Sequence, residues 1–350
     1  LTHSYILSQN AYTKLTLSAS TIANYGVYDS LSTFNREPIL KLYSDFSRSK
    51  YAARFFVNKK ISGKSSIRTG VSAELQTFHM LDSLYQGQAL AYRTLRNING
   101  NDIIPQVFLQ YKQKFTNNLQ LIIGMNSIIQ VSTSGWSIEP RAGLNWNFLP
   151  DHALSIGYGL HSSTTPIEVL NQQYISSDGI TIKPNKDLGF TKSHHFILGF
   201  DRVFNNKFRL KTEAYYQYIY NAVVEKESSS FSMLNRGAYA VTGIESIVTD
   251  MNVLENSGKG YNYGLEFTAE KFMDKGMYFL TTLSLFESKY RGSDGVLRNN
   301  AFNGNYVFNL LGGKEFQIGK KKQSRYIKRL VVDAKINWAG GQRYTPIDLE

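Results

Sequence analysis

Cysteine is absent from this 350-residue chain, and proline (7) and tryptophan (3) are scarce. The lack of cysteine excludes disulfides, thiol nucleophiles and cysteine-ligated metals. No apolar run reaches the roughly 18 residues that a transmembrane helix needs, so the sequence predicts none. Tyrosine (23) and phenylalanine (21) are abundant, and charged residues make up only 19% of the chain. That composition favours β-strands over helices.

Basic residues outnumber acidic ones and give a formal net charge of +12. Outside a cluster within residues 320–329, however, Lys and Arg are scattered one or two at a time. A face that binds nucleic acid concentrates its charge. We therefore expect no nucleic-acid partner.

Apolar and polar residues alternate with the period of a β-strand over much of the chain. From Ile138 to Phe148, the apolar residues Ile, Pro, Ala, Leu, Trp and Phe alternate with Glu, Arg, Gly and Asn. The segments 119–131, 208–220 and 261–270 repeat the pattern, so that one face suits lipid and the other suits water. Further strands are expected at 51–59, 67–78, 106–115, 153–160, 195–203, 278–290, 304–315 and 329–338, with a weaker strand near 12–24 and another before it.

Short links alternate with long connections along the chain. The short links lie at 61–65, 116–118, 149–152, 205–206 and 273–276. The long connections lie at 79–104, 132–137, 161–193, 221–259 and 291–301. Outer-membrane barrels combine short periplasmic turns with long extracellular loops in this way, whereas a soluble β-sandwich, the alternative, rarely alternates them strictly. The sequence predicts an all-β fold, an antiparallel transmembrane β-barrel.

Such a barrel should carry aromatic residues at both membrane interfaces. Aromatics that flank the short links are Phe115, Trp146, Phe148, Phe204, Phe208, Phe272 and Tyr278. Those that approach the long connections are Tyr158, Tyr216, Tyr218, Tyr220, Tyr261, Phe286, Tyr290 and Trp338. The distribution therefore agrees with two aromatic girdles.

Several segments resemble known sequences in more than their alternation of apolar and polar residues. They include SIEPRAGLNWNFLPDHALSIGYGLHSS (137–163), residues 185–225, GKGYNYGLEFTAEKFMDKGMYFLTTLSLFESKYRG (258–292), NGNYVFNLLGGKEF (303–316) and the final WAGGQRYTPIDLE. Together they resemble the barrel of TonB-dependent receptors, most of all those of Bacteroidetes bacteria. The resemblance implies a barrel of about 22 strands. We expect residues 1–350 to be a barrel portion with about 12–14 of them, and the plug domain and barrel ends to lie outside the chain.

The resemblance further implies an outer-membrane receptor that captures a scarce nutrient at its extracellular loops and imports it through the barrel. The implied partners are outer-membrane lipid and lipopolysaccharide, the receptor's own plug domain, the TonB complex through an N-terminal region, and a small nutrient ligand. A passive porin-like channel is the alternative function.

Two groups of residues are candidates for functional roles. Polar residues predicted on the lumen face are expected to line a transport path or contact the plug, or simply to pair with neighbours: Arg68, Glu74, Arg141, Arg209, Lys211, Glu213, Glu266 and Glu270. Residues of the long loops are expected to bind ligand, or to pack their own loop. They are Tyr174, Phe231, Met233, Asn235 and Tyr239.

No enzyme site is predicted. His194 and His195 are adjacent on a strand and should point to opposite faces, so they do not suit one metal ion. The other histidines are dispersed, and Ser229 and Ser230 lack a patterned acid and base. We expect no catalytic residue, no metal and no cofactor.

Overall fold

The structure, a computed structural model, describes the chain except for residues 32–35, 87–90, 134, 176–177, 237–252, 319–327, 342 and 344–350. The strands are β1 (Thr2–Ser8), β2 (Ala11–Leu31), β3 (Pro38–Lys60), β4 (Ser65–Gln86), β5 (Ala91–Lys114), β6 (Leu119–Gln130), β7 (Gly135–Leu149), β8 (His152–Ser163), β9 (Tyr174–Ile175), β10 (Thr181–Ile182), β11 (Thr191–Phe204), β12 (Phe208–Glu225), β13 (Leu254–Asp274), β14 (Met277–Arg291), β15 (Leu297–Asn299), β16 (Tyr306–Ile318) and β17 (Lys328–Ala339). The helical elements are a 3-10 turn (Val131–Thr133), α1 (Ile167–Leu170) and α2 (Met233–Arg236).

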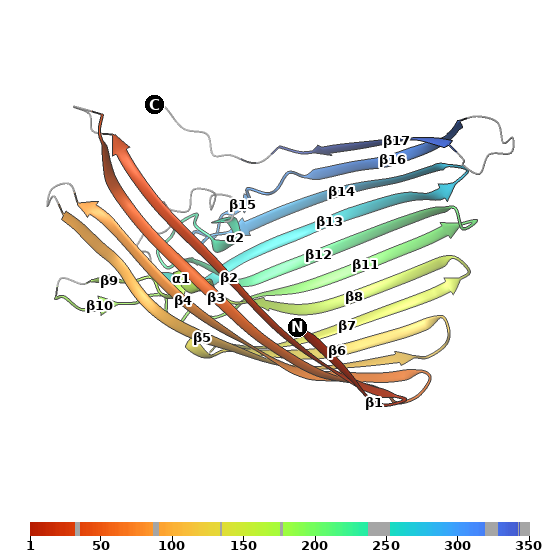
Figure 1. The fold of residues 1–350 in the computed structure, drawn as a ribbon, viewed down its shortest axis with the longest axis horizontal. Coiled ribbons are helices and arrows are strands. Elements are labelled where there is room, and N and C mark those ends of the chain that lie inside the picture. Colours follow the sequence, from red (N-terminus) through yellow and green to blue (C-terminus); the bar gives the residue numbers. More distant parts are fainter. Residues whose placement is uncertain are drawn as a thin grey trace.

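One 15-stranded antiparallel sheet forms the wall of the molecule. Its main path runs in chain order from β1 to β17, and β15 pairs with β14 outside that path. About 14 strands therefore form the wall, in agreement with the predicted 12–14. Figure 1 shows the sheet curling into an open trough, with β1 at one edge and β17 at the other.

The prediction of a long loop at 79–104 is wrong. In the structure β4 and β5 pair almost continuously from Ser65↔Gln113 to Gln86↔Ala91. These strands have 22 and 24 residues, about twice the 9–11 needed to cross a bilayer. Beyond the membrane the ladder needs no lipid-facing apolar stripe, so the sequence lost its clean alternation while the backbone pairing continued. The predicted break between the strands near 12–24 and 51–59 is shortened in the same way, because β2 extends to Leu31 and β3 begins at Pro38.

The short links form tight turns at one end of the sheet, as predicted. Asp151, Asn205 and Asn206 adopt positive φ angles of 60°, 49° and 54°, which Asp and Asn tolerate better than most residues. Lys275 and Gly276 do the same between β13 and β14, with φ angles of 52° and 73°. The long connections lie at the other end, which we identify as extracellular from this asymmetry.

Aromatic side chains form contacts at both ends of the strands. Near the tight turns, Phe148 lies 5.6 Å from Trp146 and 6.4 Å from Phe200, measured between ring centroids. Near the loops, Tyr220 lies 5.3 Å from His194 and 6.0 Å from Tyr218. His194 and Phe204 are about 10 residues apart on β11, or about 33 Å along the strand, which a tilt of about 40° reduces to about 25 Å, the height of the apolar band of outer-membrane barrels. These outward-facing aromatics agree with two girdles, but the prediction is wrong for Tyr278, Phe286 and Tyr290, which share the parity of Ser288 on the polar face of β14.

Candidate functional site

Loop residues build a packed layer at the extracellular end. Its apolar core consists of the buried side chains of Val169, Leu170, Leu188, Val223 and Leu254. These come from α1, the 164–190 loop, β12 and β13, segments far apart in the sequence. The loop layer is therefore packed onto the extracellular ends of β12 and β13, which supply part of its core.

Helix α1 joins this layer to the extended part of the wall. Its Ile167 packs against Phe78 and Met80 of β4, whereas its other apolar residues belong to the layer core. The backbone carbonyl of Glu168 accepts a hydrogen bond from Arg96 Nη1 at 3.1 Å. The tall strands β4 and β5 are thus tied to the loops above β12 and β13.

Buried asparagines connect the loops to one another. Asn185, which is fully buried, donates to Gln172 Oε1 at 2.7 Å and accepts from the backbone N–H of Leu254 at 2.9 Å. Asn256 accepts from the N–H of Gly189 at 2.8 Å. Asparagine suits this role because one side chain both donates and accepts.

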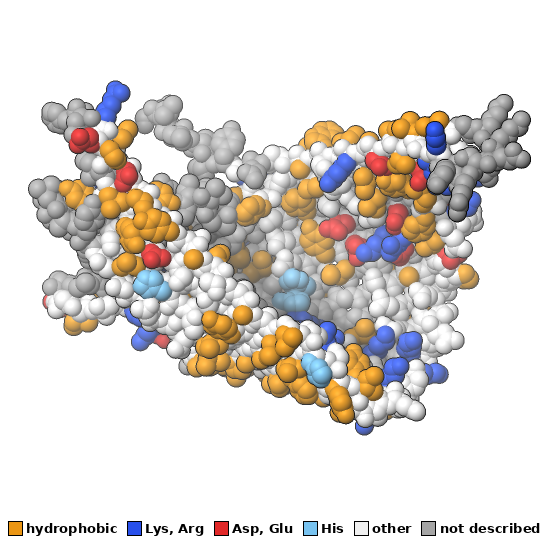
Figure 2. Space-filling model, viewed as in Figure 1, with side chains coloured by type: hydrophobic (Ala, Val, Ile, Leu, Met, Phe, Trp, Pro, Cys, Tyr) orange, Lys and Arg blue, Asp and Glu red, His pale blue; other side chains and the backbone are white. Residues whose placement is uncertain are grey.

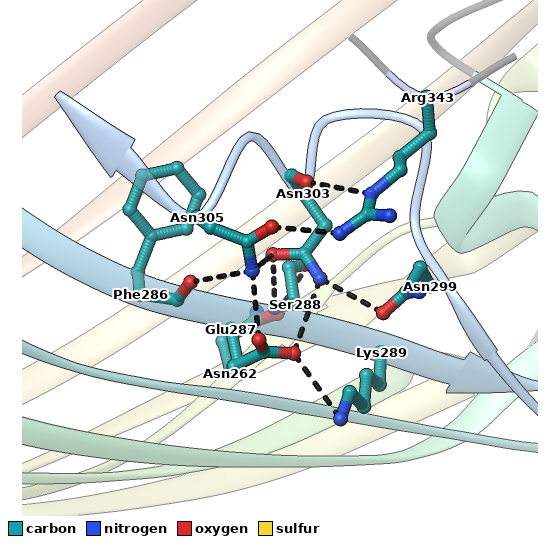
Figure 3. Close-up of polar contacts among 9 residues, drawn as sticks. All are labelled: Asn262, Phe286, Glu287, Ser288, Lys289, Asn299, Asn303, Asn305 and Arg343. Carbon is teal, nitrogen blue, oxygen red and sulfur yellow. Dashed lines mark hydrogen bonds and ion pairs between the residues drawn. The ribbon is translucent and has the colours of Figure 1, made fainter. Parts of the chain in front are cut away.

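A second network fixes the connection between β14 and β16 (Figure 3). Asn303, with no exposed surface, donates to Glu287 Oε2 at 3.2 Å and accepts from the N–H of Ser288 at 3.1 Å. Asn305 donates to Glu287 Oε1 at 2.7 Å. Arg343 then donates to Asn305 Oδ1 at 2.7 Å and to the carbonyl of Asn303, so residues that follow β17 are held against this loop.

The loop candidates occupy different surroundings. Phe231 and Met233 pack against the apolar core of the layer. Asn235 accepts from the N–H of Ala301 at 2.7 Å and so joins two loops. The backbone of Tyr174 lies in β9, and Tyr239 lies outside the described residues. For Phe231, Met233 and Asn235, contacts within the layer account for the position of the side chain, and a ligand role stays a prediction.

The register places polar residues of many strands on one face. A row of paired residues crosses the sheet: Asn58, Arg68, Gln110, Gly124, Arg141, Gly159, His195, Gln217, Asn262 and Ser288. Large apolar residues of the other parity, such as Leu210, Tyr216 and Leu265, are exposed on the opposite face. Figure 2 shows acidic and basic side chains on the hollowed face of the sheet, which is the lumen side.

Over β11–β13 the lumen charges are largely paired. Arg209 forms a two-pronged ion pair with Asp201 and lies 3.9 Å from Glu270. Lys211 lies 2.6 Å from Glu213. Glu213 is also the direct cross-strand partner of Glu266, an arrangement of like charges that is unfavourable unless a cation lies nearby.

Over β3–β8 the candidates differ in the partners that they find among the described residues. Glu74 lies 3.2 Å from Lys50. Arg141 lies 2.7 Å from Glu139. Arg68 instead lies over the Phe56 ring, with Cζ 4.0 Å from the centroid. Glu139 and Arg54 were not among the predicted lumen residues, although the alternation that places Arg141 and Arg68 on the lumen face places both there too.

The adjacent histidines of β11 do point to opposite faces, as predicted. His194 stacks with Tyr158 and Tyr220 in the girdle. His195 lies on the lumen side, 4.5 Å from His161 between ring centroids, and bonds to Gln217 at 2.7 Å. Within the described ranges, no group of three or more His, Asp or Glu side chains is arranged to hold a metal ion. No helix in the described part of the chain is long and apolar enough to span a membrane.

The comparison with protein families decides what this wall is. The family model described as "TonB dependent receptor-like, beta-barrel" matches residues 1–346. The chain belongs to this family of TonB-dependent receptors. The predicted resemblance, the antiparallel barrel fold and the outer-membrane location are thereby confirmed.

Solved structures agree with the receptor fold. The outer-membrane transporter YddB from Escherichia coli matches with a TM-score of 0.60 and 13% identity, covering 95% of this chain and 53% of that one. FpvA of P. aeruginosa, bound to pyoverdines, matches with a TM-score of 0.65 and 10% identity, and the match covers 96% of this chain and 45% of FpvA. The ferric yersiniabactin uptake receptor FyuA from Yersinia pestis matches with a TM-score of 0.65 and 9% identity, and the match covers 97% of this chain and 49% of FyuA. The receptor chain spans about half the length of these proteins, and identities this low show the fold alone.

No curated protein matches the receptor chain in sequence. The family and the structural neighbours are receptors and transporters rather than enzymes, which confirms the prediction that the chain is not an enzyme. They give no support to a passive porin.

Proposed function

We propose that the receptor imports a scarce nutrient across the outer membrane, with capture at the extracellular loops and passage through the lumen after a plug domain moves. The match to the receptor family over residues 1–346 carries this proposal. Neighbours described as an outer-membrane transporter, a pyoverdine receptor and a ferric yersiniabactin receptor support it. Residues 1–350 are then a barrel portion, and the plug and the contact with TonB belong to other parts of the protein.

The packed loop layer is the proposed capture surface. Because α1 and the buried asparagines fix its shape, the layer offers a preformed surface rather than free loops, which lowers the entropy lost on binding. Phe231, Met233 and Asn235 support this surface from within. Tyr174 and Tyr239 remain proposed contacts on the same loops.

The lumen charges over β12 and β13 are the proposed contact with the plug. Glu213 and Glu266 lie opposite each other, and Glu266 is exposed. Lys211 already lies 2.6 Å from Glu213, and a cationic side chain of the plug beside Glu266 would relieve the repulsion that is left. On the outer face, the two aromatic girdles would contact lipid and lipopolysaccharide.

Growth of the source bacterium on a panel of single nutrients tests the function. A strain without the receptor should fail on one nutrient supplied as ferric siderophore, glycan, peptide or cobalamin, and a plasmid copy should restore growth. Uptake should also stop when TonB is removed. Uptake that continues without TonB would contradict the proposal and favour the passive channel.

A further inference from the structure

A pocket on the lumen side of β3–β7 carries positive charge that the described residues do not neutralise. It has a volume of about 550 Å³, and Arg54, Arg68 and Arg141 are among its lining residues. None of the described residues that line it is acidic. Figure 2 shows basic side chains gathered on the lower part of the hollowed face, whereas acidic and basic side chains are mixed on its upper part.

Two of the three arginines have no carboxylate partner in the described part of the chain. Arg54 and Arg68 form no ion pair there, and Arg68 Nε is shielded from solvent without a hydrogen-bond acceptor. Arg141 is different, because Glu139 Oε2 accepts from its Nη2. A shielded guanidinium N–H without an acceptor is costly, so the pocket favours the arrival of an acceptor.

Aromatic rings stack against Arg54 and Arg68, the two arginines without a carboxylate partner among the described residues. Arg68 Cζ lies 4.0 Å from the Phe56 ring centroid, and Arg54 Cζ lies 5.0 Å from that of Phe108. Phe56 and Phe108 flank Gly70 on the two neighbouring strands, and a Cβ added there would lie 2.6 Å from Phe56 Cβ and 2.9 Å from Phe108 Cε1. Stacking of this kind limits the motion of a guanidinium while its N–H groups stay free to donate.

Small, neutral polar and apolar residues complete the pocket, the larger apolar ones being Phe108, Leu109, Ile122 and Met125. Gly124 lies between Gln110 and Arg141 in the cross-strand row, so Gln110 is the one side chain between the arginines of β4 and β7 at this level. Gln110, Asn126 and Ser72 supply further hydrogen-bonding groups. Charged forks surrounded by amides and a hydroxyl are suited to carboxylate and phosphate oxygens.

We infer that Arg54, Arg68 and Arg141 form an anion-binding site on the lumen wall, which takes a carboxylate or phosphate group. The group comes either from a dissolved anion that enters the lumen or from an acidic side chain of the receptor's own plug. The site goes beyond the proposed import function. Its failure would leave that function standing, because the test below measures neither growth nor uptake.

Calorimetric titration of the full-length receptor in detergent, with citrate and then inorganic phosphate as probes, tests the site. R54Q/R68Q should weaken binding by about 100-fold, since each lost charged hydrogen-bonding group costs about tenfold or more. R54K/R68K keeps the charge but loses the planar fork, so its affinity should fall between the two. The matched control K14Q/K112Q removes two positive charges from the same face outside the pocket lining and should change affinity by less than about threefold. A heat-dependent gel shift shows that each variant is folded.

Labelling with phenylglyoxal, read by mass spectrometry at each arginine, separates the two sources. For a dissolved anion, Arg54 and Arg68 are modified in the free receptor and protected by citrate. For a plug carboxylate, citrate does not bind and both arginines are already protected without it. The inference would be overturned if R54Q/R68Q bound citrate as tightly as wild type, or if the control K14Q/K112Q lost as much citrate affinity as R54Q/R68Q. It would also be overturned if the receptor bound no citrate and both arginines were nevertheless labelled without protection.

Discussion

Glu139 holds the extracellular ends of β7 and β8 together. Its side chain is only 4% exposed. Oε1 accepts from the backbone N–H of Ser162 at 2.9 Å and from its hydroxyl, and Oε2 accepts from Asn126 Nδ2 at 3.1 Å and Arg141 Nη2 at 2.7 Å. The β7–β8 ladder ends at Arg141↔Gly159, so this carboxylate fastens Ser162 where the two strands separate.

Glu139→Gln keeps the size of the side chain but replaces one acceptor oxygen with an amide that only donates. Two of the four donors then lose their acceptor, at about 1–3 kcal/mol each. Because Arg141 is 48% exposed and can turn to water, we expect a loss of about 2–4 kcal/mol. The matched control is Glu74→Gln on β4, whose carboxylate is 30% exposed and lies 3.2 Å from Lys50, where we expect a loss of at most about 1 kcal/mol.

Hydrogen exchange followed by mass spectrometry measures this effect in the full-length receptor. In E139Q, peptides that cover residues 159–163 should exchange about 30-fold faster or more, as a loss of about 2 kcal/mol requires. Peptides from the periplasmic half of β8 should exchange as in wild type. Equal exchange of the 159–163 peptides in E139Q and E74Q would refute the reasoning. The buried carboxylate of Glu139 would then stabilise the ends of β7 and β8 no more than the carboxylate of Glu74 does.

Two further perturbations act in a loop and in the wall. Hydrogen bonds from Arg298 hold the pKa of Asp294 below its ordinary value, so this ion pair is fully present above about pH 4 and is lost as the pH falls through the lowered pKa. Exchange of the 292–299 peptide should therefore rise at acid pH in wild type and at all pH values in Asp294→Asn; a flat wild-type profile would count against this. Gly70→Ala places a Cβ 2.6 Å from Phe56 Cβ and should cost about 1–3 kcal/mol in urea unfolding, whereas Gly143→Ala meets nothing within 4 Å and should be neutral. Equal unfolding midpoints would argue that the wall relaxes at Gly70.

The predicted strands agree with the structure where the strands cross the membrane. The alternation at 138–148 lies inside β7 (Gly135–Leu149), and the short link at 205–206 is the turn between β11 and β12. Lipid on one face and water on the other impose a period of two. Above the membrane that constraint ends, and for this reason β4 and β5 were cut short by the sequence prediction.

The loops were the hardest part to predict. Phe231 and Met233 are candidates because they lie in a long loop, and their apolar side chains explain why they pack against the cluster that contains Leu188 and Val223. No local pattern identifies the partners of these two residues. Leu188 is more than 35 positions away in the sequence, and Val223 lies on another element. The choice between ligand contact and loop packing therefore depends on tertiary neighbours.

The sequence by itself determined the class of the protein. Its alternation, its aromatic positions and the order of short and long connections suffice for an outer-membrane barrel and its orientation, because each of these signals is local. Only the tertiary structure decided which charges are neutralised. The register of successive strands pairs Arg209 with Asp201 but places Arg54 and Arg68 over phenyl rings. The sequence around a residue does not specify which residues of other strands will lie beside it.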